Sequence, residues 1–269
     1  MEIIKSIIFG IVEGVTEWLP ISSTGHMILL NEFIKLDVSK DFYNMFEVVI
    51  QLGAILAVVV LFFKQLFPFY KNKGNIKIDK KIINLWGKII VACIPAAIIG
   101  ILFDEVFEKL FYNPVCVSIA LIVFGILFIV IENKNKKAKI NSLEEITYNI
   151  ALLIGIFQLI AAIFPGTSRS GATILGALMI GVSRTVAAEF TFFLAVPVMF
   201  GASLLKLVKF SFAFTGLELA ILLTGMFVAF ITSMFVIKFL MNYIKKHDFK
   251  VFGYYRIVLG IIVLLYFFL

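Results

Sequence analysis

Residues 13–26 place two carboxylates, several hydroxyls and an imidazole inside an otherwise apolar segment of the chain. Glu13 and Glu17 lie four positions apart in this segment. A second interruption, residues 164–173, carries Arg169 and further hydroxyls. Because a charged side chain at membrane depth costs about 2.5–3.5 kcal/mol, such groups usually face a cavity and mark a working site. The combination indicates phosphoryl chemistry on a lipid.

The composition is that of an integral membrane protein. The 269 residues are 62% hydrophobic and 15% charged, with a mean hydropathy of +1.08, whereas a soluble domain is about half apolar and about a quarter charged. The net charge of +7 concentrates in loops, and loops rich in Lys and Arg mark the cytoplasmic side of an inner membrane protein. We therefore attribute the charge to topology and expect no nucleic-acid partner. The basic loops are 68–81, 133–139 and 245–250.

Six apolar segments are long enough to span a membrane, since a hydrocarbon core of ~30 Å needs about 20 residues. The first runs into the basic loop at 68–81, so it starts outside the cell, and the others alternate from there. Both termini are then predicted to lie outside. The predicted spans are 45–67, 83–103, 111–131, 187–208, 216–240 and 254–269.

The two remaining apolar stretches, 1–36 and 147–182, must each begin and end on one side of the membrane. Each is interrupted by one of the polar motifs. We interpret both as re-entrant hairpins of two half-helices, the first opening outside and the second inside. Non-helical backbone at this depth is tolerated only where protein or a wet cavity surrounds it.

The two halves of the chain also repeat each other. Pro20 and Pro165 occupy matching positions, and residues 22–25 align with 168–171 after a one-residue shift. The predicted fold is therefore an all-α, polytopic membrane protein, a single membrane domain over 1–269 with six transmembrane helices and two re-entrant helical hairpins in an inverted-topology repeat. Such repeats place the site near the midplane, where the hairpin tips meet. Repeat one covers about 1–131 and repeat two about 147–269; Gly10 and Glu13 match Gly155 and Gln158.

Each tip is predicted to bind an anion. Proline ends the descending half-helix, and a hydroxyl caps the returning one, Ser22 or Ser23 in the first hairpin and Thr167 or Ser168 in the second. The free N–H groups and the positive dipole end suit phosphate, and Arg169 adds a bidentate donor. The candidate diphosphate-binding residues are Arg169, Ser22, Thr24, Ser168, Ser170 and Thr173, with Thr24 and Ser170 expected to act mainly as capping or packing hydroxyls.

The candidate catalytic groups leave two alternatives open. Glu13 and Glu17 share a helix face, where they either hold Mg²⁺ or Ca²⁺ with the diphosphate completing the shell or orient His26. Ser23 as nucleophile with His26 as general acid or base is chemically sensible. The sequence does not decide whether Ser23 or His26 attacks phosphorus.

At these residues the sequence resembles the undecaprenyl-diphosphate phosphatases of the bacitracin-resistance family. The first signature is Glu13-x-x-x-Glu17 running into residues 22–26, and the second is residues 165–173. The segment 46–59 is also similar, and the resemblance covers essentially the whole chain.

The resemblance implies hydrolysis of undecaprenyl diphosphate to undecaprenyl phosphate and inorganic phosphate in the bacterial cell membrane. This reaction recycles the lipid carrier of peptidoglycan and removes the target of bacitracin. A divalent cation is commonly required in this family, and entry from the external face agrees with the outward-opening first hairpin. By the family pattern, the catalytic and phosphate-binding residues are Glu13, Glu17, Ser23, His26 and Arg169.

The rival function is a polyprenyl-phosphate transporter or flippase, because secondary transporters also use inverted repeats with broken helices. The partners expected in either case are the lipid substrate and the surrounding membrane lipids. Homodimer formation is left open by the sequence.

Overall fold

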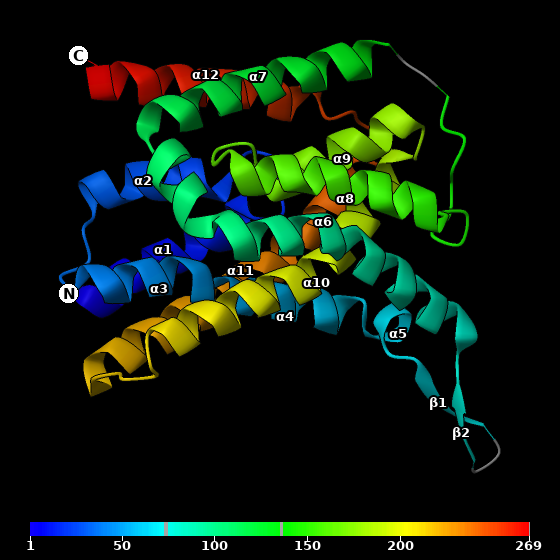
Figure 1. The fold of residues 1–269 in the computed structure, drawn as a ribbon, viewed down its shortest axis with the longest axis horizontal. Coiled ribbons are helices and arrows are strands. Elements are labelled where there is room, and N and C mark those ends of the chain that lie inside the picture. Colours follow the sequence, from blue (N-terminus) through cyan, green and yellow to red (C-terminus); the bar gives the residue numbers. More distant parts are fainter. Residues whose placement is uncertain (73–74, 135–136, 269) are drawn as a thin grey trace.

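The described part of the chain, residues 1–72, 75–134 and 137–268 of a computed structural model, consists of α-helices joined by loops, with one β-hairpin of two antiparallel strands (Figure 1). Lys73 and Lys136, which belong to the predicted basic loops, lie outside the described residues. The elements are α1 (Glu2–Thr16), α2 (Ser23–Phe33), α3 (Lys40–Val49), α4 (Gln51–Leu61), α5 (Phe63–Leu66), β1 (Phe69–Asn72), β2 (Asn75–Ile78), α6 (Lys80–Phe111), α7 (Pro114–Asn133), α8 (Tyr148–Ile163), α9 (Arg169–Ile180), α10 (Arg184–Lys209), α11 (Gly216–Tyr243) and α12 (Lys250–Phe268).

The prediction of six spans is confirmed by length and composition. Within the described ranges, six helical segments are long and apolar enough to cross a membrane. They are Lys40–Leu61, Lys80–Gly100, Pro114–Asn133, Arg184–Lys209, Gly216–Tyr243 and Lys250–Phe268.

The bounds of these spans differ from the predicted ones where local signals were overlooked. The first span begins at Lys40 because the Ser39 hydroxyl accepts a hydrogen bond from the N–H of Phe42 and so caps the helix. It ends at Leu61, and the basic loop after it holds the antiparallel pair β1–β2, which the sequence analysis did not predict. Helix α6 continues to Phe111, eight residues beyond the end of the predicted span 83–103.

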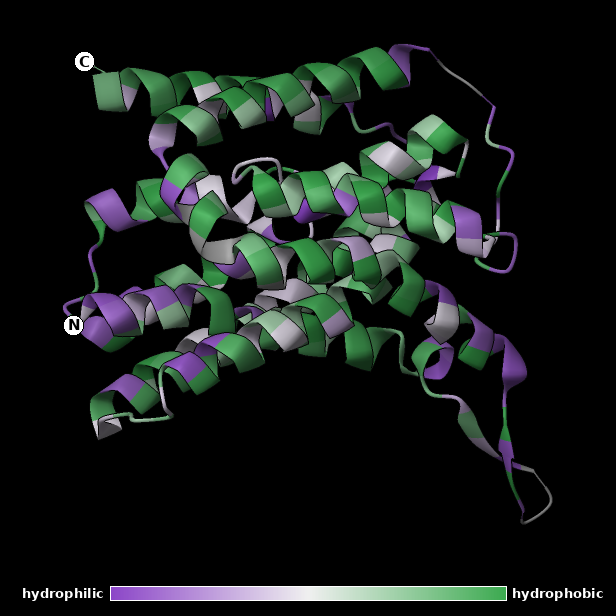
Figure 2. Cartoon of the chain, viewed as in Figure 1, coloured by the Kyte–Doolittle hydropathy of each residue, from purple (hydrophilic) through white to green (hydrophobic). Residues whose placement is uncertain are grey.

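The outer surface fits a lipid environment. Large apolar side chains on α11 point away from the rest of the protein, among them Phe227 and Phe235, whose relative exposures are 65% and 71%. Figure 2 shows hydrophobic residues along the middle of the long helices and hydrophilic ones gathered toward their ends. This distribution, with the six spans, is that of a multi-pass membrane protein.

Two pairs of short helices enter the bundle from opposite ends (Figure 1). The pair α1–α2 begins and ends at the side where both chain termini lie, and the pair α8–α9 enters from the side of the β-hairpin. Helix α1 packs on α11, and α8 packs on α6. The turns of the two pairs therefore meet inside the bundle.

Aligned glycines make both of these contacts possible. A Cβ on Gly10 of α1 would lie 2.7 Å from the carbonyl oxygen of Gly225 in α11. A Cβ on Gly155 of α8 would lie 2.3 Å from the carbonyl oxygen of Ala92 in α6. Since real Cβ atoms do not approach so closely, only glycine lets each short helix reach its partner backbone.

The remaining contacts are reciprocal between the two halves. Helix α4 packs on α11 while α10 packs on α6, and α7 pairs with α12. Two copies in opposite orientation would make these contacts. When a helix of the first half packs on a helix of the second half, the counterparts of these two helices then pack on each other as well. The boundaries of the two repeats stay a prediction.

Candidate active site

The turns of the two short-helix pairs share one backbone conformation. Ser22 precedes α2 with φ 74°, and Ser168 precedes α9 with φ 68°. The Ser22 Oγ accepts from the N–H of Gly25 at 3.4 Å, and the Ser168 Oγ accepts from that of Gly171 at 3.1 Å. Of the predicted capping alternatives, the structure therefore selects Ser22 and Ser168. A positive φ at a non-glycine residue stores on the order of 1–3 kcal/mol and clusters at functional sites.

The side chain of Glu17 joins the two hairpins. Its Oε2 accepts a hydrogen bond from the Ser23 Oγ at 2.7 Å, and its Oε1 accepts one from the Arg169 Nη2 at 2.7 Å. Ser23 opens α2 and Arg169 opens α9, so the carboxylate touches the N-terminus of both returning helices. Glu17, Ser23 and Arg169, all predicted as catalytic, are thus brought together.

The Arg169 guanidinium uses only part of its hydrogen-bonding capacity at this contact between the two hairpins. Its Nη2 also contacts the Met199 Sδ at 3.0 Å, while its Nη1 is buried and has no hydrogen-bond partner among the described residues. A buried guanidinium nitrogen without an acceptor is costly, and a phosphate oxygen would satisfy it. The Ser170 Oγ donates to the backbone oxygen of Glu17 at 3.0 Å, which holds the two turns against each other.

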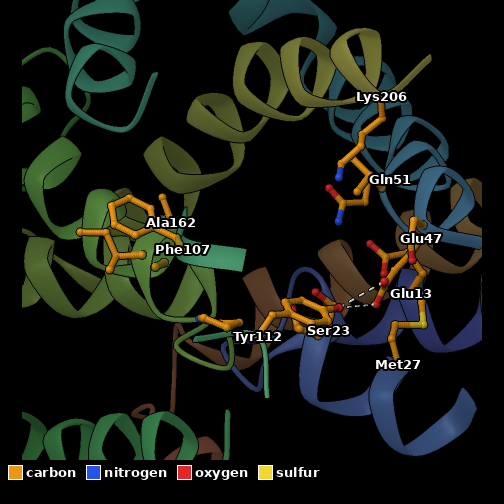
Figure 3. A pocket seen from close by; sticks show the side chains of 15 residues that line it. Glu13, Ser23, Met27, Glu47, Gln51, Phe107, Tyr112, Ala162 and Lys206 are labelled. Atoms are coloured by element: carbon orange, nitrogen blue, oxygen red, sulfur yellow. Dashed lines mark hydrogen bonds between the residues drawn. The ribbon is translucent and has the colours of Figure 1, made fainter. Parts of the chain in front are cut away.

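A cavity of about 260 Å³ opens beside Ser23. Figure 3 shows Glu13, Glu47, Gln51 and Lys206 along one side of it, with Phe107 and Ala162 across from them. The Tyr112 hydroxyl donates to Glu47 at its rim, at 3.1 Å and 3.2 Å from the two carboxylate oxygens. The other lining residues are Thr24, Met27, Asn44, Val48, Ala161, Ile163 and Pro165.

Glu13 is the most enclosed charged group of this cavity. Its relative exposure is 1%, and its Oε1 has no hydrogen-bond partner among the described residues. Gln158, which matches Glu13 in the second half, is also buried and its amide likewise lacks such a partner, but it does not line the cavity. Glu47 and Gln51, two polar residues on an otherwise apolar span, also line the cavity.

His26 is held by groups other than the predicted ones. Its Nδ1 lies 2.7 Å from the backbone oxygen of Ser22, and its Nε2 lies 2.7 Å from the Tyr255 hydroxyl. Because a carbonyl only accepts, Nδ1 carries the proton and donates to the Ser22 oxygen, while Nε2 shares a hydrogen bond with the Tyr255 hydroxyl. Among the hydrogen bonds of the described residues, none joins His26 to Ser23, Glu13 or Glu17, and Ser23 bonds Glu17 instead.

The remaining predicted hydroxyls bond mainly to protein. The Ser168 Oγ lies 3.1 Å from the Ser170 Oγ. The Thr173 Oγ1 donates to the backbone of its own helix at Arg169, 2.9 Å away, and accepts from the Thr191 Oγ1. Thr24 lines the cavity. This agrees with capping and packing for Ser170 and adds Thr173 to the packing hydroxyls.

A divalent cation fits the site only if the protein and the substrate diphosphate both supply ligands. The described residues contain no group of three or more His, Cys, Asp or Glu side chains arranged to hold a metal, and both oxygens of Glu17 are already occupied. Glu47 accepts from Tyr112 through both of its oxygens, so the Glu13 Oε1, which has no partner among the described residues, is the carboxylate oxygen available to an ion. Mg²⁺ is commonly held by one or two carboxylates plus substrate phosphates, and this arrangement suits that mode.

Two residues of α12 belong to the site although the sequence analysis did not single them out. Tyr255 contacts His26, and the neighbouring Arg256 is fully buried between the two turns. A signal was present, because Arg256 is an arginine inside a predicted span, where ionisable residues are functional candidates by default.

The comparisons with known proteins agree with this geometry. The family model described as "Bacitracin resistance protein BacA" matches residues 6–262. The chain belongs to the BacA family. Curated relatives of this chain include the undecaprenyl-diphosphatase of Desulfitobacterium hafniense, 68% identical over 99% of this chain and 96% of that protein. Undecaprenyl-diphosphatase 1 of Clostridium acetobutylicum is 65% identical (99% and 98% covered), and an Enterococcus faecalis undecaprenyl-diphosphatase is 63% identical (98% and 97%).

Proposed function

We propose that this BacA family member hydrolyses undecaprenyl diphosphate to undecaprenyl phosphate and inorganic phosphate in the bacterial cell membrane. The observation that carries the proposal is the Glu17 carboxylate bonded at once to a hydroxyl nucleophile, Ser23, and to a phosphate-binding cation, Arg169. The names of the relatives supply the substrate. The reaction recycles the peptidoglycan lipid carrier and withdraws the target of bacitracin.

In the first step, Ser23 attacks the terminal phosphorus. Its Oγ forms a bond to that phosphorus, and the bond from phosphorus to the bridging oxygen breaks. Glu17, 2.7 Å from the Oγ, accepts the serine proton and passes it to the bridging oxygen, which leaves as undecaprenyl phosphate. The Nη1 of Arg169 and the N–H groups that open α2 and α9 neutralise charge on the phosphate oxygens.

In the second step, water attacks the phosphoserine. Glu17 accepts a proton from the water, the bond from Ser23 to phosphorus breaks, and the proton returns to the serine Oγ as inorganic phosphate leaves. His26 is the less favoured nucleophile, because attack through Nε2 requires loss of the Tyr255 hydrogen bond. The His26 Nδ1 instead holds the first turn by its hydrogen bond to the backbone oxygen of Ser22.

We also propose a Mg²⁺ or Ca²⁺ ion held by the Glu13 carboxylate together with the diphosphate. Bound there, the ion would polarise phosphoryl oxygens and neutralise charge that develops on them. Glu17, the other predicted ligand, accepts one hydrogen bond on each oxygen, from Ser23 and from Arg169, and its part in holding the ion stays a prediction.

We propose that the cavity opens to the external face. Both termini lie at the end of the bundle from which α1–α2 enters, opposite the basic β-hairpin (Figure 1), and basic segments mark the cytoplasmic side. The two short-helix pairs then enter the membrane without crossing it, as re-entrant hairpins.

Phosphate release from undecaprenyl and farnesyl diphosphates by the purified protein in detergent tests the proposal. Mg²⁺ or Ca²⁺ should support release, EDTA should abolish it, and Ser23→Ala should be inactive while eluting as a folded protein. A folded wild-type protein that releases no phosphate from either lipid would overturn it.

The short helices enter from opposite ends of the bundle (Figure 1). This arrangement favours a second candidate function, which is the movement of polyprenyl phosphate between leaflets. Ser23→Ala in proteoliposomes separates the two functions. Transfer of a labelled polyprenyl phosphate by this variant would establish transport apart from hydrolysis, and absence of transfer would leave hydrolysis alone.

A further inference from the structure

Arg256 connects the two turns through their backbone. Its Nη1 donates to the carbonyl oxygen of Pro20 at 3.2 Å, and its Nη2 donates to those of Gly166 at 3.0 Å and Thr167 at 2.7 Å. Its Nε lies 3.4 Å from the carbonyl oxygen of Leu121 in α7. One guanidinium thus binds the first turn, the second turn and a neighbouring span.

Burying the Arg256 guanidinium costs free energy unless the surrounding groups accept its hydrogen bonds. Arg256 is 0% exposed inside an apolar span, where an unpaired charge is strongly disfavoured. The carbonyl groups of the turns have no helical partners, because the helices are interrupted there. The guanidinium supplies these donors, and charge-assisted hydrogen bonds are roughly twice as strong as neutral ones.

The preceding residue holds the imidazole of the site. The Tyr255 hydroxyl lies 2.7 Å from the His26 Nε2, and the two rings are 4° from parallel with centroids 5.6 Å apart. Together with the contact from Nδ1 to the Ser22 oxygen, this fixes the ring on both nitrogens. Consecutive residues of α12 therefore reach both turns and His26.

We propose that Tyr255 and Arg256 are positioning residues for the phosphatase site, an inference that rests on the proposed function. Arg256 keeps the turns in register so that Ser23 and Arg169 meet on Glu17, and Tyr255 fixes the orientation of His26. A displacement of 1 Å in such a site lowers the rate by about 100-fold.

The first test compares Arg256→Lys with Arg184→Lys. A lysine retains the charge but cannot reach three carbonyl groups at once, so kcat should fall by about 100-fold with little change in KM. Arg184, the first residue of α10, pairs with Glu132 and does not line the cavity beside Ser23, so its variant should keep the wild-type kcat. Equal kcat values for Arg256→Lys and wild type would overturn the role of Arg256.

A second readout does not depend on activity. Trp18 lies in the first turn, fully buried, with its ring 5.3 Å from that of Phe192. In a Trp86→Phe background it is the sole tryptophan, and acrylamide quenching of its fluorescence should rise in Arg256→Lys but not in Arg184→Lys. An inactive wild type would defeat the proposed function, whereas unchanged quenching would defeat the role of Arg256.

Gly171→Ala provides a second variant if Arg256→Lys does not fold. The new Cβ would lie 2.7 Å from the Arg256 Nη1, so it displaces the guanidinium without removing it. It should lower kcat and raise Trp18 quenching in the same way. Wild-type values of both would contradict the proposal.

Tyr255→Phe and Tyr254→Phe form the matched pair for His26. Phenylalanine keeps the ring but loses one hydrogen bond, worth about a tenfold fall in kcat at unchanged KM. Tyr254 is 57% exposed, and its variant should match wild type. Equal kcat values for the two variants would overturn the role of Tyr255.

Discussion

Glu17 and Arg169 are 152 positions apart in the sequence, yet the Oε1 of one lies 2.7 Å from the Nη2 of the other. Both side chains are largely buried. Neither hairpin contains the pair by itself, because Glu17 follows α1 and Arg169 opens α9. The reactive centre is therefore a property of the contact between the two halves.

Arg169→Lys should lower kcat/KM by about 100-fold, the usual loss when one donor to a developing oxyanion is removed. A lysine keeps the charge but cannot bond Glu17 and a phosphate oxygen through separate nitrogens. Steady-state phosphate release measures the effect. Wild-type kcat/KM in a folded Arg169→Lys protein would remove Arg169 from the site.

Glu13→Gln should weaken the cation requirement of the enzyme. The concentration of Ca²⁺ or Mg²⁺ that gives half-maximal activity should rise by at least about tenfold, because a carboxylate ligand is replaced by a neutral amide. Equilibrium dialysis with ⁴⁵Ca²⁺ and a soluble diphosphate checks binding directly. Glu145→Gln, in an exposed loop, is the control, and equal Ca²⁺ binding by both variants would exclude Glu13 as a ligand.

Gly53→Ala should destabilise the bundle, whereas Gly100→Ala should not. A Cβ on Gly53 of α4 would lie 1.9 Å from the backbone oxygen of Met226 in α11, while a Cβ on Gly100 meets nothing within 4 Å. Overpacking costs about 1–3 kcal/mol. Thermal unfolding in detergent compares the two, and equal midpoints would show that α4 and α11 do not pack as described.

Glu132→Gln should lower stability by about 2 kcal/mol, since the buried carboxylate accepts from the Arg184 guanidinium and from the N–H of Phe249. Lys81 and Glu144 form a pair that is exposed on both sides, so Glu144→Gln should leave the unfolding midpoint unchanged. Similar midpoints for the two variants would contradict the prediction.

Much of the architecture is readable from the sequence because the membrane restricts the options. Apolar length gives six spans, and Pro20 and Pro165 with the serines after them indicate the two interrupted segments. The β1–β2 pair was missed because residues 69–78 were considered only for their positive charge, although Asn72, Gly74 and Asn75 are residue types that favour a turn.

The details of the site depend on contacts that no local pattern encodes. The Tyr255 contact with His26 joins residues 229 positions apart, and the Arg256 contact with Pro20 joins residues 236 positions apart. Spacing on one helix suggested Ser23 with His26 instead. The real partner of Ser23 is Glu17, six positions earlier, because the turn between them reverses the chain.

The contacts of Arg256 with Pro20, Gly166 and Thr167 also set an order of events during biosynthesis. The first hairpin leaves the ribosome early, but its polar turn acquires this partner only when translation reaches α12. Until then the nascent chain must shelter unpaired carbonyl groups within the membrane or the insertion machinery. The contact between the two turns is therefore completed only after the last helix has been synthesised.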